Sequence, residues 1–448
     1  MKKFLKITAV IVLSLLIFFV GTFKYRQYQA NQFLIPKNAN AVVKISVDEI
    51  YKTLAANIIA NPVYYFKSDL KKDSTNKNDK FYNGLKIPAS LYFYNIAGAP
   101  STTFFSRFQI KNVKDFENFL RNTLHLEIAK EIGNINIAKS KLGNFSICYN
   151  SKAAALALAT QIENYEPILL DILNEKNFIK TSDSQFKKIL TRKEHLAFSN
   201  KENSGWINFN NGVINFCNEF ITNEVIPLSS IKHRKLSENA TIGFWLNANF
   251  KSIDKKVYKY KNFSLEKDSL LKYYNNNIDF EWTNSIQQTD SVITYEYNDD
   301  FEKVEKVSLK KRNIPLFSLN FSTKQNGFKN YLAKQGLVNL DSNILNKNTF
   351  PLYKVFIKTD ANNINFSTAK EQTVNTDKVS SDDFFYLNID FIRLNKQLEI
   401  PIVTNYFKIL KRLEVKGKAI DQDKANLQGK LELKNEDINS LYQILKSF

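Results

Sequence analysis

Hydrophobic and polar residues alternate over many short segments of this chain, and several of these segments run directly into a stretch with helical spacing. Alternation with a period of two predicts a strand, and apolar residues three or four positions apart predict one face of a helix. The clearest pair of such strand–helix units is ISVDEIYKTL at residues 45–54 and LNIDFIRLNKQL at residues 387–398. Each unit has an aspartate at the junction, Asp48 and Asp390, which we expect to cap the helix.

A second strand–helix pattern carries a Lys-Asn pair after the strand. It relates residues 107–120 (RFQIKNVKDFENFL) to residues 430–445 (KLELKNEDINSLYQIL), and residues 317–332 resemble both. We also expect a strand followed by a helix at residues 205–220 and at residues 241–257. This recurrence suggests an internal duplication, although the same burial pattern makes unrelated short amphipathic units look alike.

The other alternating segments pair as hairpins across turn residues. Hairpins with helices between them predict antiparallel sheets covered on one face, which is an α+β architecture. We expect two sheet-and-helix lobes, with residues 38–235 in the first and residues 236–448 in the second. The predicted hairpins join residues 90–95 with 102–110, 144–149 with 153–159, 279–282 with 292–297, 352–358 with 363–367, and 413–420 with 424–433.

One segment near the N-terminus departs from this alternation. Ile7–Phe23 is a run of seventeen uncharged, mostly apolar residues. As a helix it would reach about 25 Å, which is at the short end of a span across a hydrocarbon core of about 30 Å. We predict a transmembrane helix over residues 7–23, after a cytoplasmic tail of residues 1–6 and before a juxtamembrane linker of residues 24–37.

Two other interpretations of this run are a cleaved signal peptide and a buried helix of a soluble protein. The residues from Gly21 to Arg26 are bulky and basic, and this disfavours cleavage, which usually needs small residues. The charges on the two sides of the run are nearly balanced, so they set the orientation only weakly. We expect the short tail inside, which places the protein at the inner (cytoplasmic) membrane with an extracytoplasmic, periplasmic ectodomain.

Composition indicates an ordered globular protein. Of the 448 residues 44% are hydrophobic, and glycine (12) and proline (9) are too scarce for a linker or a stalk. The net charge of +19 favours anionic surfaces. Lysine is nevertheless spread along the chain, with maxima only at residues 255–261 and 306–312. We expect an envelope protein or an anionic polymer as partner, the membrane itself through residues 7–23, and no nucleic acid.

Residues able to carry chemistry are few and isolated. The only histidines are His125, His195 and His233, and none has a spacing typical of zinc ligands. No nucleophile elbow, phosphate-binding loop or dinucleotide-binding motif occurs. Cys148 and Cys217 lie in apolar stretches and are expected to be buried free thiols, with a single disulfide as the alternative. We predict no catalytic residue, no metal site and no cofactor.

Acidic residues give two weak candidates. Asp360, Asn362 and Glu371 stand at the first, third and twelfth positions of an EF-hand loop, but the sixth position lacks the required glycine. Adjacent acids at residues 299–300 and 382–383 would supply a carboxylate pair, yet neighbouring acids in a turn usually face solvent. Neither pattern predicts a site.

Tyrosine clusters offer a different kind of surface. They occur at residues 64–66, 258–260 and 273–274, and an exposed cluster would stack on sugar rings or sit among lipid head groups. The alternation of tyrosine and lysine at residues 258–261 is also typical of an ordinary half-buried strand. Most of the 36 phenylalanines are expected to form the core.

The first and last strand–helix units together resemble a group of uncharacterised exported proteins of the bacterial envelope. The segment Ile35–Ile45 is similar to their P-x-x-A-x-x-x-V-x-I first strand, and Gly429–Leu445 is similar to their closing strand and N-x-L helix. Those proteins are lipoproteins or carry one N-terminal anchor, and their outer part is α+β. This chain has no lipid-bearing cysteine. The resemblance implies location and fold, and it transfers no reaction and no functional residue.

These observations lead to one expected function and two alternatives. We expect a single-pass, membrane-anchored envelope protein whose ectodomain binds or scaffolds a partner without catalysis. The first alternative is a protein that handles lipids or glycolipids, for which an apolar groove between sheet and helices is required. The second is an envelope hydrolase, which requires a pocket with two carboxylates or a nucleophile beside one of the histidines.

Overall fold

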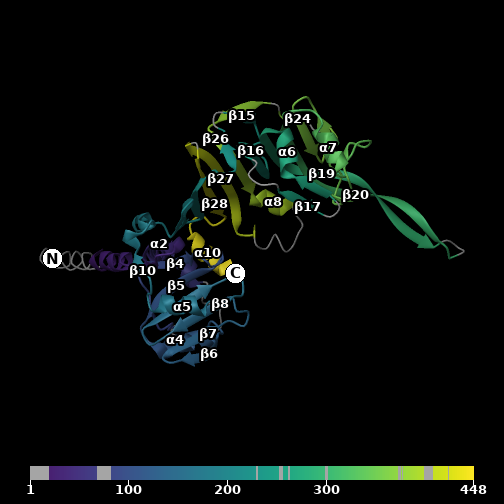
Figure 1. Ribbon diagram of the computed structural model, residues 1–448. Coiled ribbons are helices and arrows are strands. Elements are labelled where there is room, and N and C mark those ends of the chain that lie inside the picture. Colours follow the sequence, from purple (N-terminus) through teal and green to yellow (C-terminus); the bar gives the residue numbers. More distant parts are fainter. Residues whose placement is uncertain are drawn as a thin grey trace, which may run out of the picture. The chain divides into compact units, whose positions relative to one another are not determined.

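The chain folds as two compact units, shown in Figure 1. Unit 1 consists of Met1–Asn211 and Asp437–Lys446, and unit 2 of Gly212–Glu436 with the last two residues. Unit 2 is therefore an insertion in unit 1, whereas the sequence analysis places a single boundary at residue 235. The computed structural model describes residues 20–67, 82–228, 231–251, 256–260, 263–297, 301–371, 375, 377–397, 407–421 and 423–447.

Unit 1 is a sheet with a few short helices on it. Its helices are residues 20–31, α2 (Val47–Ala60), α3 (Pro62–Lys67), α4 (Val113–Asn122), α5 (Glu166–Leu173) and α10 (Ser440–Ser447), with 3₁₀ turns at Thr181–Asp183 and Lys187–Thr191. Its strands are β1 (Leu34–Pro36), β2 (Ala39–Ile45), β3 (Leu85–Lys86), β4 (Leu91–Ile96), β5 (Phe104–Ile110), β6 (Glu127–Ile132), β7 (Ile135–Lys139), β8 (Phe145–Tyr149), β9 (Ala153–Leu158), β10 (Phe178–Lys180), β11 (Leu196–Asn200) and β12 (Asn203–Asn210).

The main sheet of unit 1 runs in the order β12-β11-β2-β4-β5-β9-β8-β7-β6, and every pair is antiparallel. Successive residues of a strand point to opposite faces. In β8, Tyr149 packs edge-on against Phe116 of α4, whereas Cys148 belongs to the cluster that contains Leu169 of α5. Helices α4 and α5 therefore cover the two faces of the same strands, and both faces are core.

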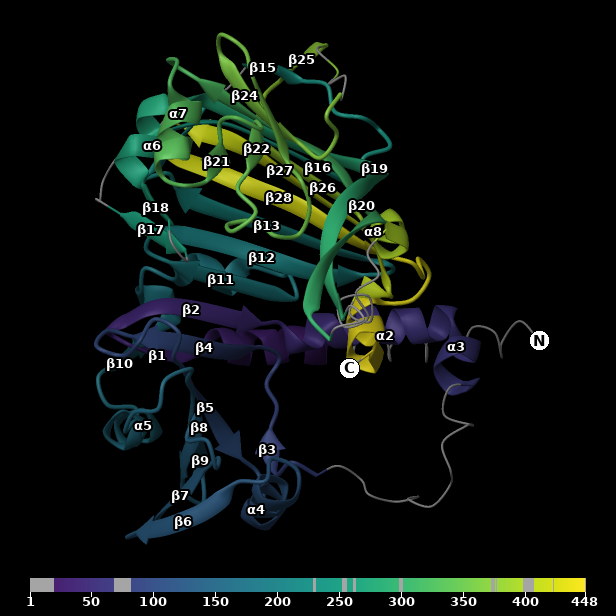
Figure 2. The same ribbon diagram turned by 90° about the vertical axis from the view of Figure 1, so that its right-hand side faces the viewer.

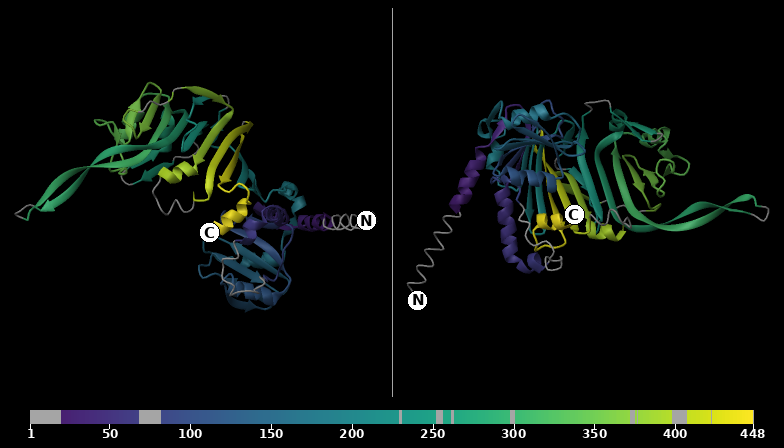
Figure 3. Two further views of the ribbon diagram at one scale, coloured as in Figure 1. Left: turned by 180° about the vertical axis from the view of Figure 1, so that it is seen from behind. Right: turned by 90° about the horizontal axis from the view of Figure 1, so that it is seen from below.

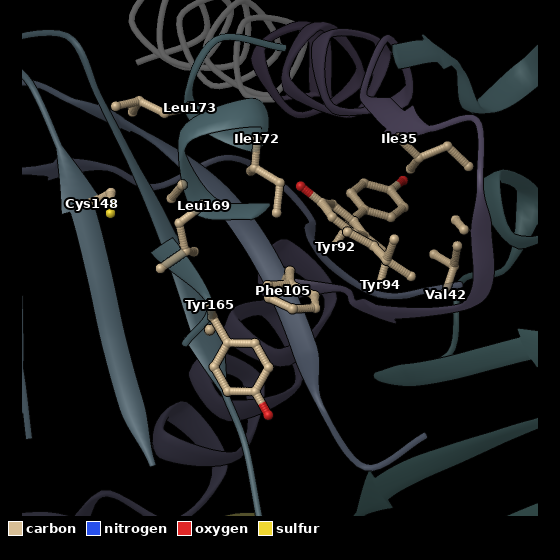
Figure 4. Packing of buried hydrophobic residues seen from close by; sticks show 14 of the residues in the cluster. Ile35, Val42, Tyr92, Tyr94, Phe105, Cys148, Tyr165, Leu169, Ile172 and Leu173 are labelled. Atoms are coloured by element: carbon tan, nitrogen blue, oxygen red, sulfur yellow. The ribbon is translucent and has the colours of Figure 1, made fainter. Parts of the chain in front are cut away.

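The larger core of unit 1 is rich in aromatic side chains. Figure 4 shows Tyr92 and Tyr94 side by side, with Phe105 between them and α5. All three side chains are almost completely buried. The ring of Phe33 stacks on Tyr92 with its centroid 4.7 Å away, so the segment after the N-terminal helix is packed onto this core.

Unit 2 is also built mainly of strands. Its helices are α6 (Lys267–Tyr273), α7 (Phe328–Lys334) and α8 (Phe391–Gln397). Its strands are β13 (Val213–Ile221), β14 (Val225–Pro227), β15 (Ile231–Arg234), β16 (Ile242–Phe250), β17 (Val257–Tyr260), β18 (Phe263–Glu266), β19 (Tyr274–Tyr297), β20 (Lys303–Thr323), β21 (Val338–Asn339), β22 (Ile344–Leu345), β23 (Phe356–Thr359), β24 (Asn363–Ser367), β25 (Lys378–Ser381), β26 (Asp383–Asp390), β27 (Leu410–Asp421) and β28 (Lys424–Leu433).

The main sheet of unit 2 runs in the order β13-β28-β27-β26-β16-β19-β20-β24-β23-β22-β21, again antiparallel throughout. Figure 2 shows β13, β28 and β27 side by side along this sheet. Helix α7 buries Phe328 and Leu332 against β24, and α8 buries Phe391 and Leu394 beside Trp282 of β19. Small two-stranded ladders, β15–β25 and β17–β18, complete the unit.

The predicted α+β class is wrong, because strands dominate the structure. Strands take up 48% of the described residues and helices 23%, and the strands form extended antiparallel sheets. Several local errors contributed: the helix expected at the end of residues 241–257 does not occur among the described residues there, because β16 continues to Phe250 and Val257 begins β17. Residues 213–220, expected as a helix, form β13, which pairs with β28 from Val213 opposite Glu432 to Ile221 opposite Lys424. This ladder overrides the helical spacing.

Another local error is a predicted hairpin between residues 279–282 and residues 292–297. Both segments belong to the single strand β19, which pairs with β20 along nearly its whole length. A bulge between Trp282 and Asn284 shifts the register of this ladder without ending the strand. The four other predicted hairpins are present as antiparallel pairs.

The predicted transmembrane helix is not supported. Residues 7–19 of the apolar run lie outside the described residues, and the helical residues that the structure does describe here, 20–31, include Lys24 and Arg26. Within the part of the chain that the structure describes, no helix is both long enough and apolar enough to cross a membrane.

The two aspartates at the strand–helix junctions have different roles. The Asp390 carboxylate accepts a hydrogen bond from the Arg393 backbone N–H at 2.9 Å, so its predicted role as a helix cap is confirmed. Asp48 is not a cap, because α2 already begins at Val47. Its carboxylate instead accepts two hydrogen bonds from the guanidinium of Arg26, at 2.9 and 3.0 Å, which ties the N-terminal helix to α2.

Candidate functional site

The three histidines do not form a site together. His125 is exposed in a loop of unit 1 and has a positive φ of 52°, His195 is buried in unit 1, and His233 is buried in unit 2. His233 stacks on Trp245 with its ring centroid 4.1 Å away. No cluster of three or more histidine, cysteine, aspartate or glutamate side chains that would hold a metal ion occurs among the described residues.

His195 has a structural role that its hydrogen bonds define. Its Nδ1 accepts a hydrogen bond from the Phe209 backbone N–H at 2.8 Å. Its Nε2 lies 2.9 Å from the hydroxyl of Thr53, which itself donates to the Glu49 carbonyl. These partners require a neutral ring with the proton on Nε2. Burial lowers the pKa of His195, and this effect outweighs nearby Glu49, which favours the charged form.

Unit 1 should therefore lose stability as the pH falls below about 6.5, the usual histidine pKa in an unfolded chain. The folded-state pKa is the lower one, so the unfolded chain binds the extra proton first, and protonation of Nδ1 would also break the bond from Phe209. The difference in the stability of unit 1 between pH 7.5 and pH 5.5 can be measured by urea unfolding, with hydrogen exchange in unit 1 peptides as the readout. His195→Gln should reduce this difference in stability, and His125→Gln should not. If the two variants showed the same pH dependence, the structural role of His195 would be contradicted.

The weak acidic candidates do not form a cation site. Asp360 accepts hydrogen bonds from the Asn362 backbone and the Asn363 side chain within its own turn. Glu371 is exposed, and Asn363 lies in strand β24, so the segment does not form an EF-hand loop. Asp383 pairs with Lys418 at 3.7 Å. Residues 299–300 lie outside the described residues.

The tyrosine clusters are split between core and surface, with Tyr65 and Tyr274 buried and Tyr64 and Phe66 exposed, and both cysteines are buried. Tyr65 bonds the buried Asn57, and Tyr274 is 3% exposed, so neither presents a sugar-binding surface. Tyr258 is exposed on the short ladder β17–β18. Cys148 and Cys217 are buried free thiols, as predicted, and burial raises the pKa of Cys148 to about 11. A thiol with that pKa is a poor nucleophile at neutral pH.

Sequence reasoning missed a buried charge network in unit 2. The Arg234 guanidinium donates from Nε to Asp279 at 2.8 Å and from Nη1 to Glu281 at 2.8 Å, and all three residues are less than one-tenth exposed. Asn320 donates to Asp279 at 2.9 Å and the Ser237 backbone N–H donates to Glu281. The one available signal was the alternation IDFEW, which places both acids on one face of β19.

The longest hairpin of unit 2 ends in a projecting arm. Figures 1 and 3 show β19 and β20 continuing as a two-stranded ribbon beyond the rest of the unit. The last contacts with the body are made by Gln288, which donates to the Lys354 carbonyl at 2.8 Å, and by Asp290, which pairs with Lys347 at 2.9 Å. Residues 291–297 and 303–309 then pair, within the described ladders, only with each other. We call these residues the arm; it is about 23 Å long.

One face of the arm carries a group of exposed apolar side chains, and Lys303 and Glu305 lie among them on the same face. Residues opposite each other in an antiparallel ladder share a face, and the register therefore places Tyr295, Tyr297, Val307 and Leu309 together. Their exposed fractions are 53%, 71%, 64% and 75%. Phe301, in the loop at the tip, is 85% exposed. We call the first four side chains the apolar face.

The other face of the arm is mainly polar. It carries Glu296, Lys306 and the exposed Val304, and Lys310, one residue beyond the arm, lies on the same side of the ribbon. Lys306 and Glu296 form an ion pair at 2.8 Å. Acidic and basic residues are interleaved on the arm, so it has no strong field of one sign. On the first face, Lys303 Nζ lies 4.1 Å from the centre of the Tyr295 ring and the Tyr295 hydroxyl donates to Glu305 at 3.3 Å, while Tyr297, Val307 and Leu309 are mainly solvent-exposed.

Comparison with known proteins assigns no family. No protein-family model matches the chain, and no curated protein matches it. Among solved structures, crystal forms IV, III and I of a protein designated TP0453 match with TM-scores of 0.23, 0.24 and 0.23 and sequence identities of 10%, 9% and 10%. These matches cover 78% of this chain and 94%, 93% and 94% of that protein. At these TM-scores the likeness says nothing about fold or function.

Proposed function

We propose that this chain is a non-catalytic binding protein of the cell envelope that holds a partner protein through the apolar face of its arm. The observation that carries the proposal is the exposure of Tyr295, Tyr297, Val307 and Leu309 on one face of a projecting ribbon. A contiguous exposed apolar face on a soluble domain marks an interaction surface. The envelope location is part of the proposal and rests on the sequence alone, through the resemblance of Ile35–Ile45 and Gly429–Leu445 to exported envelope proteins.

A protein is the partner that suits this arm best. Beyond residue 290 each strand pairs on one side only within the described ladders, so its other edge offers backbone donors and acceptors. A strand of another protein satisfies such an edge by sheet extension, whereas hydrocarbon leaves it unsatisfied at a cost of several kcal/mol per group. The interleaved charges of the arm also give little attraction to an anionic lipid surface.

The buried acids of unit 2 support binding over catalysis. Asp279 and Glu281 are the kind of carboxylate pair that a hydrolase would need, but both are held by the same guanidinium of Arg234. Both carboxylates are also buried, so their oxygens are engaged in the bonds that hold the sheet.

The double variant Val307→Asp/Leu309→Asp should abolish partner binding by the full-length chain. Two carboxylates on the apolar face would have to lose their hydration in the complex, and we expect binding weakened by at least about a hundredfold. A photo-crosslinking amino acid at Leu309 in native membranes would identify the partner, and the affinity of the purified partner for each variant would then be measured.

The matched control is Lys306→Asn/Lys310→Asn, which changes the net charge by the same amount on the opposite face and should bind within about threefold of wild type. Crosslinks from Lys310 should be absent or much weaker than those from Leu309. Equal loss of affinity in both double variants, or crosslinks only to a second copy of this chain, would contradict the proposal.

A further inference from the structure

A preformed cleft lies in unit 1 between the N-terminal helix and the sheet. Its volume is about 460 Å³, within the range of small-molecule sites. The helix is fixed over it by the two hydrogen bonds from Arg26 to Asp48 and by a third from Gln27 to Glu49 at 2.8 Å. The cleft is thus part of the folded unit and does not depend on a loop that must close.

Aromatic and aliphatic side chains make up a large part of the cleft lining, beside polar ones such as Gln29 and Gln32. Phe33, Phe108 and Phe178 line the cleft, together with Ala30 and Pro88. Phe33 is stacked on the buried Tyr92, and Phe178 packs edge-on against Tyr94 at a centroid distance of 6.1 Å, so the aromatic core of Figure 4 supports the lining. Burying a hydrocarbon chain here gains about 25 cal/mol for each Å² of apolar surface removed from water.

The charged residues around the cleft are mostly cationic. Arg26, Lys86, Arg107 and Glu175 line it; Arg26 is paired with Asp48 and Arg107 with Glu175, which leaves the Lys86 ammonium as the excess positive charge. Arg107 is held in place by its bond to the Leu173 carbonyl at 3.2 Å and by Glu175 at 2.9 Å. Lys86 is exposed at the edge of the cleft. A largely apolar lining with excess positive charge at its edge is complementary to a molecule that has an apolar chain and an anionic end.

We propose that this cleft binds a single-chain amphiphile with an anionic head group. The chain lies against Phe33, Phe108 and Phe178, and the head group lies near Lys86. This site is in unit 1 and does not involve the arm of unit 2, so it is independent of the proposed partner binding.

Binding of dansylated undecanoic acid to the purified full-length chain, followed by dansyl fluorescence, tests the apolar part of the proposal. Gln109 lines the cleft and is exposed on β5. Gln109→Trp should fill the cleft and weaken binding by at least about tenfold. Gln428→Trp, at an exposed strand position in unit 2, is the matched control and should bind like wild type. Absence of saturable binding to wild type, or wild-type affinity in Gln109→Trp, would overturn the site.

Competition experiments test the head group. Palmitate and a single-chain lysophospholipid with an anionic head should both displace the probe. Stronger competition by palmitate indicates a fatty acid site, and stronger competition by the lysophospholipid indicates a phospholipid site. Inorganic phosphate and acetate lack the chain and should not compete. Lys86→Glu should weaken the binding of palmitate by about fivefold or more and leave the binding of hexadecanol unchanged. Lys152 is an exposed lysine outside the cleft, so Lys152→Glu should change the affinity for neither ligand. Equal competition by palmitate and hexadecanol would refute the anionic requirement.

Discussion

Replacing Arg234 with methionine should destabilise unit 2 by about 3–5 kcal/mol, because removal of one partner from a buried charge network leaves the others uncompensated. Asp279 and Glu281 are 4% and 6% exposed, and each accepts a bond from the same guanidinium. Their remaining partners, the Asn320 amide and the Ser237 N–H, are neutral and do not replace the lost positive charge.

Hydrogen exchange measured by mass spectrometry would detect this loss of stability as faster exchange in peptides from β16, β19 and β20. Peptides from unit 1 are measured separately in the same experiment. The matched control is Arg312→Met, which removes an exposed pair with Asp290 and should cost less than about 1 kcal/mol. A triple variant that adds Asp279→Asn and Glu281→Gln to Arg234→Met should recover much of the loss, because no buried charge remains. If Arg234→Met were as stable as the Arg312 control, the network would not support the sheet.

Replacing Asn57 with leucine should destabilise unit 1 by about 3–5 kcal/mol, since it leaves several buried polar groups unpaired at about 1–3 kcal/mol each. Asn57 is 1% exposed near the end of α2. Its amide donates to the Asp437 carbonyl at 2.7 Å, and its oxygen accepts from the Asn439 backbone N–H at 2.9 Å and from the Tyr65 hydroxyl.

The control for this variant is Asn61→Leu on the same helix end. Asn61 also reaches the Asp437 carbonyl, at 3.2 Å, but it is partly exposed, so water can replace it and the cost should stay below about 1 kcal/mol. Exchange in peptides covering α10 and α2 would be measured for both variants. Loss of protection in Asn61→Leu as large as in Asn57→Leu would mean that the buried amide is not what holds the C-terminal segment.

Features that depend on neighbouring residues were predictable from the sequence. The hairpin of β8 and β9 follows from two alternating segments joined by Asn150, whose side chain accepts hydrogen bonds from the turn that follows it. The cap at Asp390 likewise needs only the next three residues. Strand β13 was missed because its partner in the ladder, β28, lies about two hundred residues away in the sequence, and spacing within the segment says nothing about that partner.

The candidate surfaces were harder to predict for two physical reasons. Alternation in the arm, as in TYEY at residues 294–297, normally indicates a half-buried strand. The residue types alone do not show that Tyr295 and Tyr297 remain exposed, because their exposure depends on which other segments pack against them. The Arg234 network joins residues 45 and 47 positions apart, and the cleft of unit 1 joins the N-terminal helix to β5 and β10. Both arise only from tertiary structure.

The insertion of unit 2 into unit 1 sets the order in which the newly synthesised protein can mature. The ribosome makes every strand of unit 2 before it makes Asp437–Lys446, the segment that unit 1 still lacks. Until that segment emerges, Asn57 has neither Asp437 nor Asn439 to bond. Unit 1 is thus started first and completed last, and a nascent chain carries the strands of unit 2 on a unit 1 that stays incomplete until Asp437–Lys446 has been made.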